Sequence, residues 1–158
     1  MSLQTLHEVT AFLWQEADLL DHKEHDAWIA LWEESGRYIV PIDPESTDYA
    51  NTLNYSNDDH AMRKMRAHRL RSGEAVSTTP APRTARSTSR IVILKEDGDT
   101  IVVRAAQNLR EFHKDRFRHY TSNIEYTLKR AGGSFKIAQK VIRLLNSDDA
   151  IASIGYIL

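Results

Sequence analysis

The spacing of apolar residues predicts two helices at the start of the chain. Residues 5–20 carry an apolar stripe at helical spacing, with Thr5 and Glu8 placed to form a capping box. The stripe consists of Leu6, Val9, Phe12, Leu13, Ala17 and Leu20. Residues 24–34 repeat the pattern on a shorter scale, and Gly36 suits a helix exit. The chain therefore opens with an amphipathic helix followed by a shorter one.

The middle of the chain has a more irregular pattern of polar and apolar residues. It predicts a short strand over 37–42, a polar loop over 43–57, a helix from Asp58 or Asp59 to about Leu70, and an irregular segment over 73–85. Two prolines in the last of these segments disfavour helix. This region connects the helical start to a β-rich second half.

The second half of the chain is a succession of long β-rich runs. They cover residues 86–96, 100–113, 116–130 and 134–146, with a short final run at 150–158. Asp97-Gly98 and Gly132-Gly133 are hairpin signals, because such turns need residues that tolerate positive φ. Sequential hairpins predict an antiparallel meander. Helices first and strands afterwards indicate an α+β fold, with N-terminal helices on a long, strongly curved, cone-shaped sheet and one domain over 1–158.

Composition excludes several classes of chemistry. The chain has 158 residues, no cysteine and a formal net charge of −1. It therefore has no thiolate for a zinc site, an iron–sulfur cluster or a covalent intermediate. No apolar run approaches the ~20 residues of a membrane span, and no signal peptide is recognisable. We expect a cytoplasmic protein with no membrane contact.

Charge is distributed unevenly along the chain. Residues 1–62 carry 13 Asp and Glu against two Lys and Arg, whereas residues 63–90 carry eight basic residues against one acid. Acidic and basic elements can face each other within the fold, or the basic stretch can dock an acidic partner surface. The basic stretch contains no aromatic residue, and single-stranded nucleic acids need such stacking platforms. We therefore expect no nucleic-acid partner.

Motif searches give no established active site. The sequence lacks the dinucleotide, Walker, zincin and nucleophile-elbow motifs. His22 and His25 lie three residues apart, and His113 and His119 flank a predicted turn, but neither pair has an identifiable third ligand. We therefore predict no metal site on this chain.

Carboxylates gather where the first predicted helix gives way to the second. A buried carboxylate such as Asp21, facing the mouth of a cone, can act as a general base. It can equally cap the second helix or pair with an arginine, and we favour these structural roles. Arginines gather at the start of the first predicted long strand, in the segment "TTPAPRTARSTSR".

Four segments together resemble one known family. They are "FLWQEADLLDHKEHDAWIALWEESGRYIVPI", "YSNDDHAMRKMRAHRLRSG", "PRTARSTSRIVI" and "FKIAQKVIRLLNSDDAIASIGYIL", in this order over nearly the whole chain. The sequence resembles the small (β) subunits of aromatic-ring-hydroxylating dioxygenases. The resemblance implies the fold of nuclear transport factor 2 and scytalone dehydratase. It also implies a structural, non-catalytic chain in a catabolic complex that adds dioxygen to an aromatic compound.

The resemblance further implies where the cofactors and partners lie. A large α subunit is expected to carry the Rieske [2Fe-2S] cluster and the mononuclear iron, and this chain no cofactor. Three α and three β subunits are expected to assemble, with the β subunits forming a homotrimer. The polar loop 43–57 and the basic segment 63–71 are candidate partner-contact regions.

One departure from the family pattern concerns proton transfer. Where related dehydratases and isomerases of this fold use a histidine with a carboxylate near Asp21, this chain has Arg86. A guanidinium is always charged and is a poor base, but it can form an ion pair with Asp21. The alternative hypothesis is a free-standing dehydratase or isomerase, or a small-ligand binding protein, that uses the cone cavity. Its candidate residues are Asp21, Tyr38, Arg86 and His119.

Overall fold

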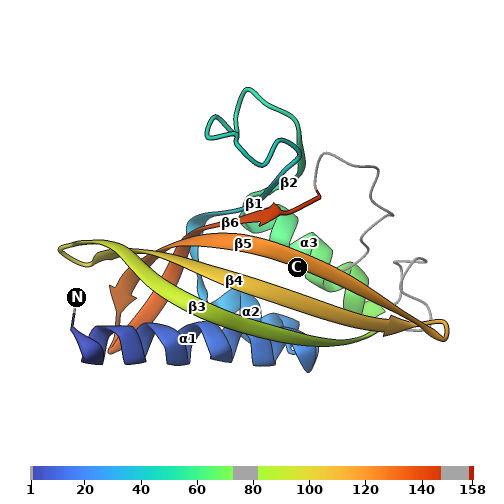
Figure 1. Cartoon of the computed structure of the whole chain (residues 1–158), viewed down its shortest axis with the longest axis horizontal. Coiled ribbons are helices and arrows are strands. Elements are labelled where there is room, and N and C mark those ends of the chain that lie inside the picture. The colour runs from blue at the N-terminus through green and yellow to red at the C-terminus, as the bar shows by residue number, and fades with distance from the viewer. Residues whose placement is uncertain (1, 73–81, 147–156) are drawn as a thin grey trace.

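An open six-stranded sheet forms the framework of the protein, with helices packed against it (Figure 1). The computed structural model describes residues 2–72, 82–146 and 157–158. The elements in chain order are α1 (Leu3–Asp21), α2 (His25–Ala30), β1 (Trp32–Pro41), β2 (Asn54–Asp58), α3 (His60–Ser72), β3 (Arg83–Asp97), β4 (Thr100–His113), β5 (Arg116–Ala131) and β6 (Ser134–Leu144). The predicted α+β class is confirmed.

Strands β3 to β6 form the predicted antiparallel meander. Gly98, Gly132 and Gly133 have positive φ at their hairpin turns, with values of 58°, 55° and 80°. Lys114 and Asp115 form the third turn at φ 52° and 59°. These conformations suit two-residue hairpin turns, because their backbone twist matches that of the flanking strands.

The strand order is β2-β1-β6-β5-β4-β3, which places the first strand beside the last. β1 pairs with β6 in parallel, with Tyr38 opposite Lys140, and with β2 in antiparallel fashion. The sequence did not predict the parallel pairing, since strand partners far apart in the chain leave no local signal. This arrangement brings residues of β1 and β6 to the centre of the core.

Helix α1 packs its apolar stripe against the sheet, and Figure 1 shows it running alongside β3. The buried face includes Val9, Phe12, Leu13 and Leu20, as the spacing predicts. The N-cap is Ser2, whose Oγ accepts a hydrogen bond from the Thr5 amide at 3.0 Å, so the predicted capping box at Thr5 is wrong.

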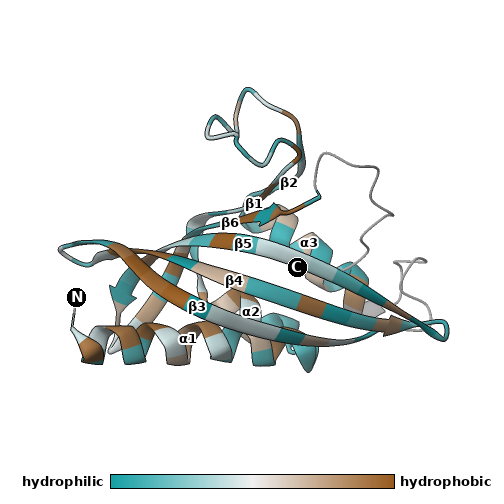
Figure 2. Ribbon diagram, viewed as in Figure 1, coloured by the Kyte–Doolittle hydropathy of each residue, from teal (hydrophilic) through white to brown (hydrophobic). Residues whose placement is uncertain are grey.

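One face of the sheet is buried beneath the helices. Along β4, Ile101, Val103, Ala105 and Leu109 alternate with half-buried or exposed residues, as expected for a strand with one covered face. β3 is mostly hydrophilic at its start, hydrophobic over residues 91–94 and hydrophilic again at its end (Figure 2). The two faces of the sheet therefore have different surroundings.

The second predicted helix and the predicted polar loop both need correction. Helix α2 ends at Ala30, and Trp32 already belongs to β1. A Cβ on Gly36 would lie 2.9 Å from the carbonyl oxygens of Glu33 and Ile137, so this glycine permits a close backbone approach within β1. Strand β2 forms inside the predicted loop and pairs with β1. The predicted final run at 150–158 lies mostly outside the described residues.

Helix α3 is held against β1 by a buried arginine. The Arg63 side chain is fully buried and donates hydrogen bonds to the main-chain carbonyls of Glu33, at 3.1 Å, and Gly36. Its guanidinium lies 4.3 Å from the centre of the Trp32 ring. The Asp59 carboxylate caps α3 by accepting from the Met62 amide at 2.9 Å. Arg63 therefore connects α3 to β1.

Candidate functional site

Asp21 and Arg86, which the sequence proposed as neighbours, form an ion pair. An Asp21 oxygen lies 2.5 Å from the Arg86 guanidinium and accepts from the Thr84 hydroxyl at 2.9 Å. The second Asp21 oxygen accepts from the Arg86 amide at 2.9 Å. Arg86 also donates to the Ile157 carbonyl. The carboxylate at the end of α1 is therefore held by three donors from β3.

Tyr38 lies inside the core and its hydroxyl is already engaged. It accepts a hydrogen bond from the Leu158 amide at 2.9 Å, and its side chain is buried. The Tyr38 ring packs edge-to-face with Trp28 and Trp32, at centroid distances of 6.2 and 6.3 Å. Burial raises the pKa of Tyr38 to about 12, so the hydroxyl stays neutral at ordinary pH.

His119 lies apart from the other three candidate residues. It is exposed on β5, where it pairs in register with Arg110 of β4. Arg110 belongs to the face of the sheet that is not covered by the helices. The structure therefore brings together Asp21 and Arg86, buries Tyr38 in the core, and leaves His119 on another surface.

A buried ionic network lies at the centre of the fold, and sequence reasoning missed it. Lys140 of β6 contacts both carboxylate oxygens of Glu16 at 3.0 and 2.9 Å, with side chains 0% and 2% exposed. Tyr126 donates to the same carboxylate at 2.7 Å, and Trp28 donates to it at 3.0 Å. Lys140 also donates to the Leu158 carbonyl at 3.2 Å. The one available signal was Glu16 itself, a charged residue on the apolar stripe of α1.

The network has perturbed acid–base properties but no free hydrogen-bonding position on Glu16. Burial lowers the pKa of Lys140, and the Glu16 carboxylate opposes this shift. Burial and the same carboxylate raise the pKa of Tyr126. Each Glu16 oxygen accepts two hydrogen bonds from the protein. This arrangement is suited to holding α1, α2, β5 and β6 together.

Aromatic and aliphatic side chains surround this network. Trp28 and Trp32 pack edge-to-face at 5.5 Å, and Phe12 packs on Phe135 at 5.6 Å. Ile157 and Leu158 are also buried in the core cluster. A hollow of 260 Å³ borders the Asp21–Arg86 pair at the surface, with Trp14 and Thr88 in its lining. Asp21 thus lies beside a small surface hollow, and the hydrogen-bond partners of its carboxylate come from the protein itself.

The described residues contain no group of three or more potential metal-binding side chains. A Rieske cluster needs two thiolates and two imidazoles, and the full sequence contains no cysteine. The side chains of this protein therefore do not fit the ligand requirement of the cluster. Within the described part of the chain, no helix is long and apolar enough to cross a membrane.

The sequence profile of the family described as "Ring hydroxylating beta subunit" matches residues 15–148, most of the chain. The chain belongs to this family. The resemblance inferred from the four sequence segments is therefore confirmed.

Two relatives illustrate the similarity of this beta-subunit chain to known proteins. It is 28% identical to the anthranilate 1,2-dioxygenase small subunit of Acinetobacter baylyi, over 92% of this chain and 93% of that one. It is 30% identical to the small oxygenase component of the p-cumate 2,3-dioxygenase system of Pseudomonas putida, over 86% and 77%. Both relatives are small subunits of dioxygenases that act on aromatic compounds.

Solved structures show the same fold. The β subunit of benzoate 1,2-dioxygenase from Burkholderia mallei superposes with a TM-score of 0.77 and 23% identity, over 99% of this chain and 98% of that one. Naphthalene 1,2-dioxygenase with bound indole gives a TM-score of 0.78 and 21% identity, over 91% and 80%. An NTF2-like protein from Novosphingobium aromaticivorans gives 0.62 and 16%, over 89% and 81%. The predicted NTF2-like fold is thus confirmed for this beta-subunit chain.

Alkaline unfolding tests the position of Tyr38 within the beta subunit. An unfolded tyrosine loses its proton near pH 10, whereas folded Tyr38 keeps it until about pH 12. The folded state therefore binds more protons in this window, and the free energy of unfolding falls as the pH rises, by about 3 kcal/mol in total from this group. Tyr38→Phe is expected to remove this contribution to the pH dependence of the free energy of unfolding, as measured by urea unfolding between about pH 9 and pH 12.

Tyr55→Phe provides the matched control, because Tyr55 is 43% exposed on β2. This variant is expected to retain the wild-type pH dependence. Equal slopes for wild type and Tyr38→Phe would contradict the buried, neutral hydroxyl.

Proposed function

We propose that this chain is a structural, non-catalytic β subunit of a dioxygenase that adds dioxygen to an aromatic compound in a catabolic pathway. The main support is the interior of the fold, where Glu16, Lys140 and Tyr38 are each engaged by other groups of the chain. A substrate in this interior would have to displace those contacts. The names of the relatives support an aromatic compound as the substrate of the complex.

The proposed partner is a large α subunit that holds the Rieske cluster and the mononuclear iron. Sequence composition supports this division, because a chain without cysteine cannot supply the cluster's thiolates. We propose a homotrimer of this chain within a heterohexamer of three α and three β subunits, located in the cytoplasm. In this assembly residues 1–158 act as one domain.

A cavity enzyme of the same fold is the alternative function. The one favourable observation is the 260 Å³ hollow beside Asp21. Against it, the Asp21 carboxylate is neutralised by Arg86, and His119 lies on a different surface. We therefore do not adopt a dehydratase, isomerase or ligand-binding role.

Co-expression with a large α chain of a ring-hydroxylating dioxygenase tests the proposed function. The two chains are expected to co-purify in equal amounts, and the complex is expected to show Rieske absorption and to oxygenate an aromatic substrate. The isolated β chain is expected to bind no stoichiometric iron and to turn over no substrate. Conversion of a substrate by the isolated chain would refute the proposal.

Asp21→Asn separates the structural role from the catalytic alternative. The variant weakens the ion pair to Arg86, so the midpoint of thermal unfolding is expected to fall by several degrees, as for a loss of about 1 kcal/mol. The oxygenation rate per Rieske cluster in the purified complex is expected to stay within about twofold of wild type. Asp18→Asn is the control, since Asp18 is exposed on the preceding turn of α1. A large loss of rate with unchanged assembly would favour the cavity enzyme.

A further inference from the structure

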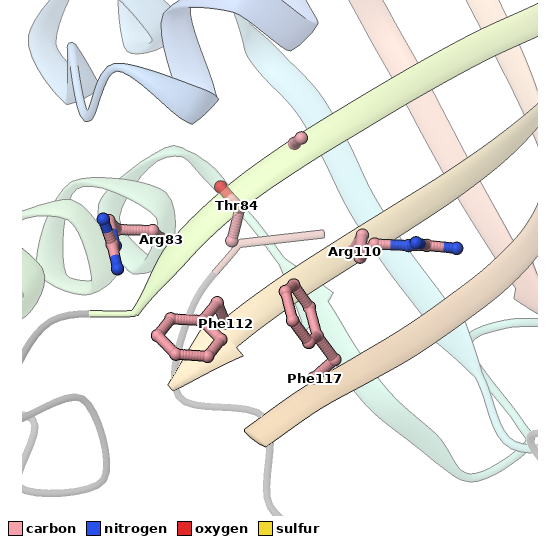
Figure 3. A pocket seen from close by; sticks show the side chains of 6 residues that line it. Arg83, Thr84, Arg110, Phe112 and Phe117 are labelled. Atoms are coloured by element: carbon pink, nitrogen blue, oxygen red, sulfur yellow. The ribbon is translucent and has the colours of Figure 1, made fainter. Parts of the chain in front are cut away.

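An aromatic groove of 430 Å³ lies at one end of the sheet, where β3 begins and β4 turns into β5 (Figure 3). Phe112 and Phe117 form its centre, with ring centroids 4.9 Å apart. Phe112 pairs in register with Arg83 on one side and Phe117 on the other. We call this feature the Phe112–Phe117 groove. Its position on the helix-free face of the sheet leaves it open to another molecule.

The Phe112–Phe117 groove combines exposed aromatic surface with positive charge. Phe117 is 64% exposed, which is unusual for so large an apolar side chain. Figure 3 shows Arg83 and Arg110 on either side of the two rings. Exposed Lys114 and Arg116 lie in the adjoining turn, together with Asp115. An occupant of matching chemistry presents an apolar side chain surrounded by carboxylates.

Such a surface exists on the same chain, in the connection between β1 and β2. Residues 42–53, which we call the Leu53 loop, contain Asp43, Glu45 and Asp48 and no lysine or arginine. All three carboxylates are exposed, and Leu53 is 79% exposed. The loop projects away from the sheet (Figure 1). It therefore presents a leucine in acidic surroundings.

The Leu53 loop is held in place by many hydrogen bonds. Arg143 of β6 donates to the carbonyls of Pro44 and Ser46 at 3.2 and 2.7 Å, and to the Tyr49 hydroxyl at 2.6 Å. Within the loop, Ser46 and Thr52 hydroxyls lie 2.9 Å apart. A loop ordered before binding loses little conformational entropy on docking. Holding an exposed leucine in a fixed position is useful when another surface receives it.

We propose that the Leu53 loop of one copy docks in the Phe112–Phe117 groove of a second copy, and that three such contacts close the homotrimer. The inference rests on the trimer in the proposed function and assigns its contact surfaces. The two surfaces are different regions of one chain, so the contact is head-to-tail, and a head-to-tail contact closes a ring when its rotation permits. The opposite charges of the loop and the groove argue for a second copy as the occupant.

Two single substitutions remove one side of the contact each. Leu53→Arg places a cation opposite the basic groove, and Phe117→Asp places an anion opposite the acidic loop. Each is expected to weaken self-association by about 30-fold or more, the effect of losing a central contact residue. Both residues are well exposed, so the variants are expected to fold normally. Leu3→Arg and Leu94→Asp are matched controls at exposed positions outside the two surfaces.

Mixing the two variants provides the decisive measurement. Each variant alone is expected to sediment as an 18.1 kDa monomer at a concentration where the wild type is trimeric. An equimolar mixture is expected to form heterodimers, because the intact loop of the Phe117→Asp chain fits the intact groove of the Leu53→Arg chain. Analytical ultracentrifugation and native mass spectrometry distinguish these species.

The possible failures of this inference and of the proposed function differ. Variants that remain trimeric, or a mixture that forms no heterodimer, would overturn the loop–groove contact while leaving the β-subunit role standing. Trimeric variants that no longer bind the large subunit would assign the groove to that subunit instead and also overturn the inference. A wild-type chain that stays monomeric both alone and beside the large chain would overturn the trimer itself.

Discussion

Lys140→Met is expected to lower the free energy of unfolding by about 3–5 kcal/mol, the range for breaking a buried ion pair from one side. The substitution leaves the Glu16 carboxylate inside the core with only Tyr126 and Trp28 as donors. It also removes the donor to the Leu158 carbonyl. Urea unfolding followed by circular dichroism at neutral pH measures the loss.

A double variant separates the buried charge from the lost packing. Glu16→Gln together with Lys140→Met removes both charges, so it is expected to recover a large part of the stability lost in Lys140→Met alone. Lys129→Met, at an exposed position on β5, is the matched control and is expected to change stability by less than about 0.5 kcal/mol. A Lys140→Met variant no less stable than this control would contradict the network.

Arg63→Met is expected to lower the free energy of unfolding by about 3 kcal/mol, as measured by urea unfolding followed by circular dichroism. The substitution leaves the carbonyls of Glu33 and Gly36 without their buried donor, and each lost partner costs about 1–3 kcal/mol. It also removes the cation from the face of Trp32. Because α3 is anchored through this side chain, the loss is expected to affect the packing of α3 on β1.

Two further variants test whether the geometry of the Arg63 guanidinium matters. Arg63→Lys retains the charge but not the planar set of donors, so it is expected to restore only part of the stability. Lys64→Met is the control, because Lys64 is the exposed neighbour in α3. If Arg63→Lys were as stable as the wild type, charge alone would account for the anchoring.

Local signals in the sequence predicted the elements whose structure is set by nearby residues. The turns at Gly98 and Gly132 are examples, because positive φ selects glycine directly. The apolar stripe of α1 is another, since its spacing follows from helix geometry. The end of α2 was less predictable, because Trp32 continues the helical spacing but is drawn into β1 by pairing with Ile137.

Contacts between distant segments were outside the reach of sequence patterns. Glu16 and Lys140 form the central ion pair, but they lie 124 positions apart. Nothing in the sequence pattern around either residue therefore indicates that they meet. The residue pattern allowed Asp21 to pair with an arginine, and the family resemblance then indicated Arg86 as the partner. Tyr38 was predicted near the same cavity, but its bond to Leu158 depends on how the chain returns to the core.

The position of β1 between β2 and β6 has a consequence for how the protein forms. β1 cannot obtain its parallel partner until residues 134–144 have been synthesised and have left the ribosome. Until then β1 lacks the strand that joins it to the rest of the sheet, and such long-range pairings form slowly. We therefore expect the yield of folded protein on overproduction to respond to the rate of elongation.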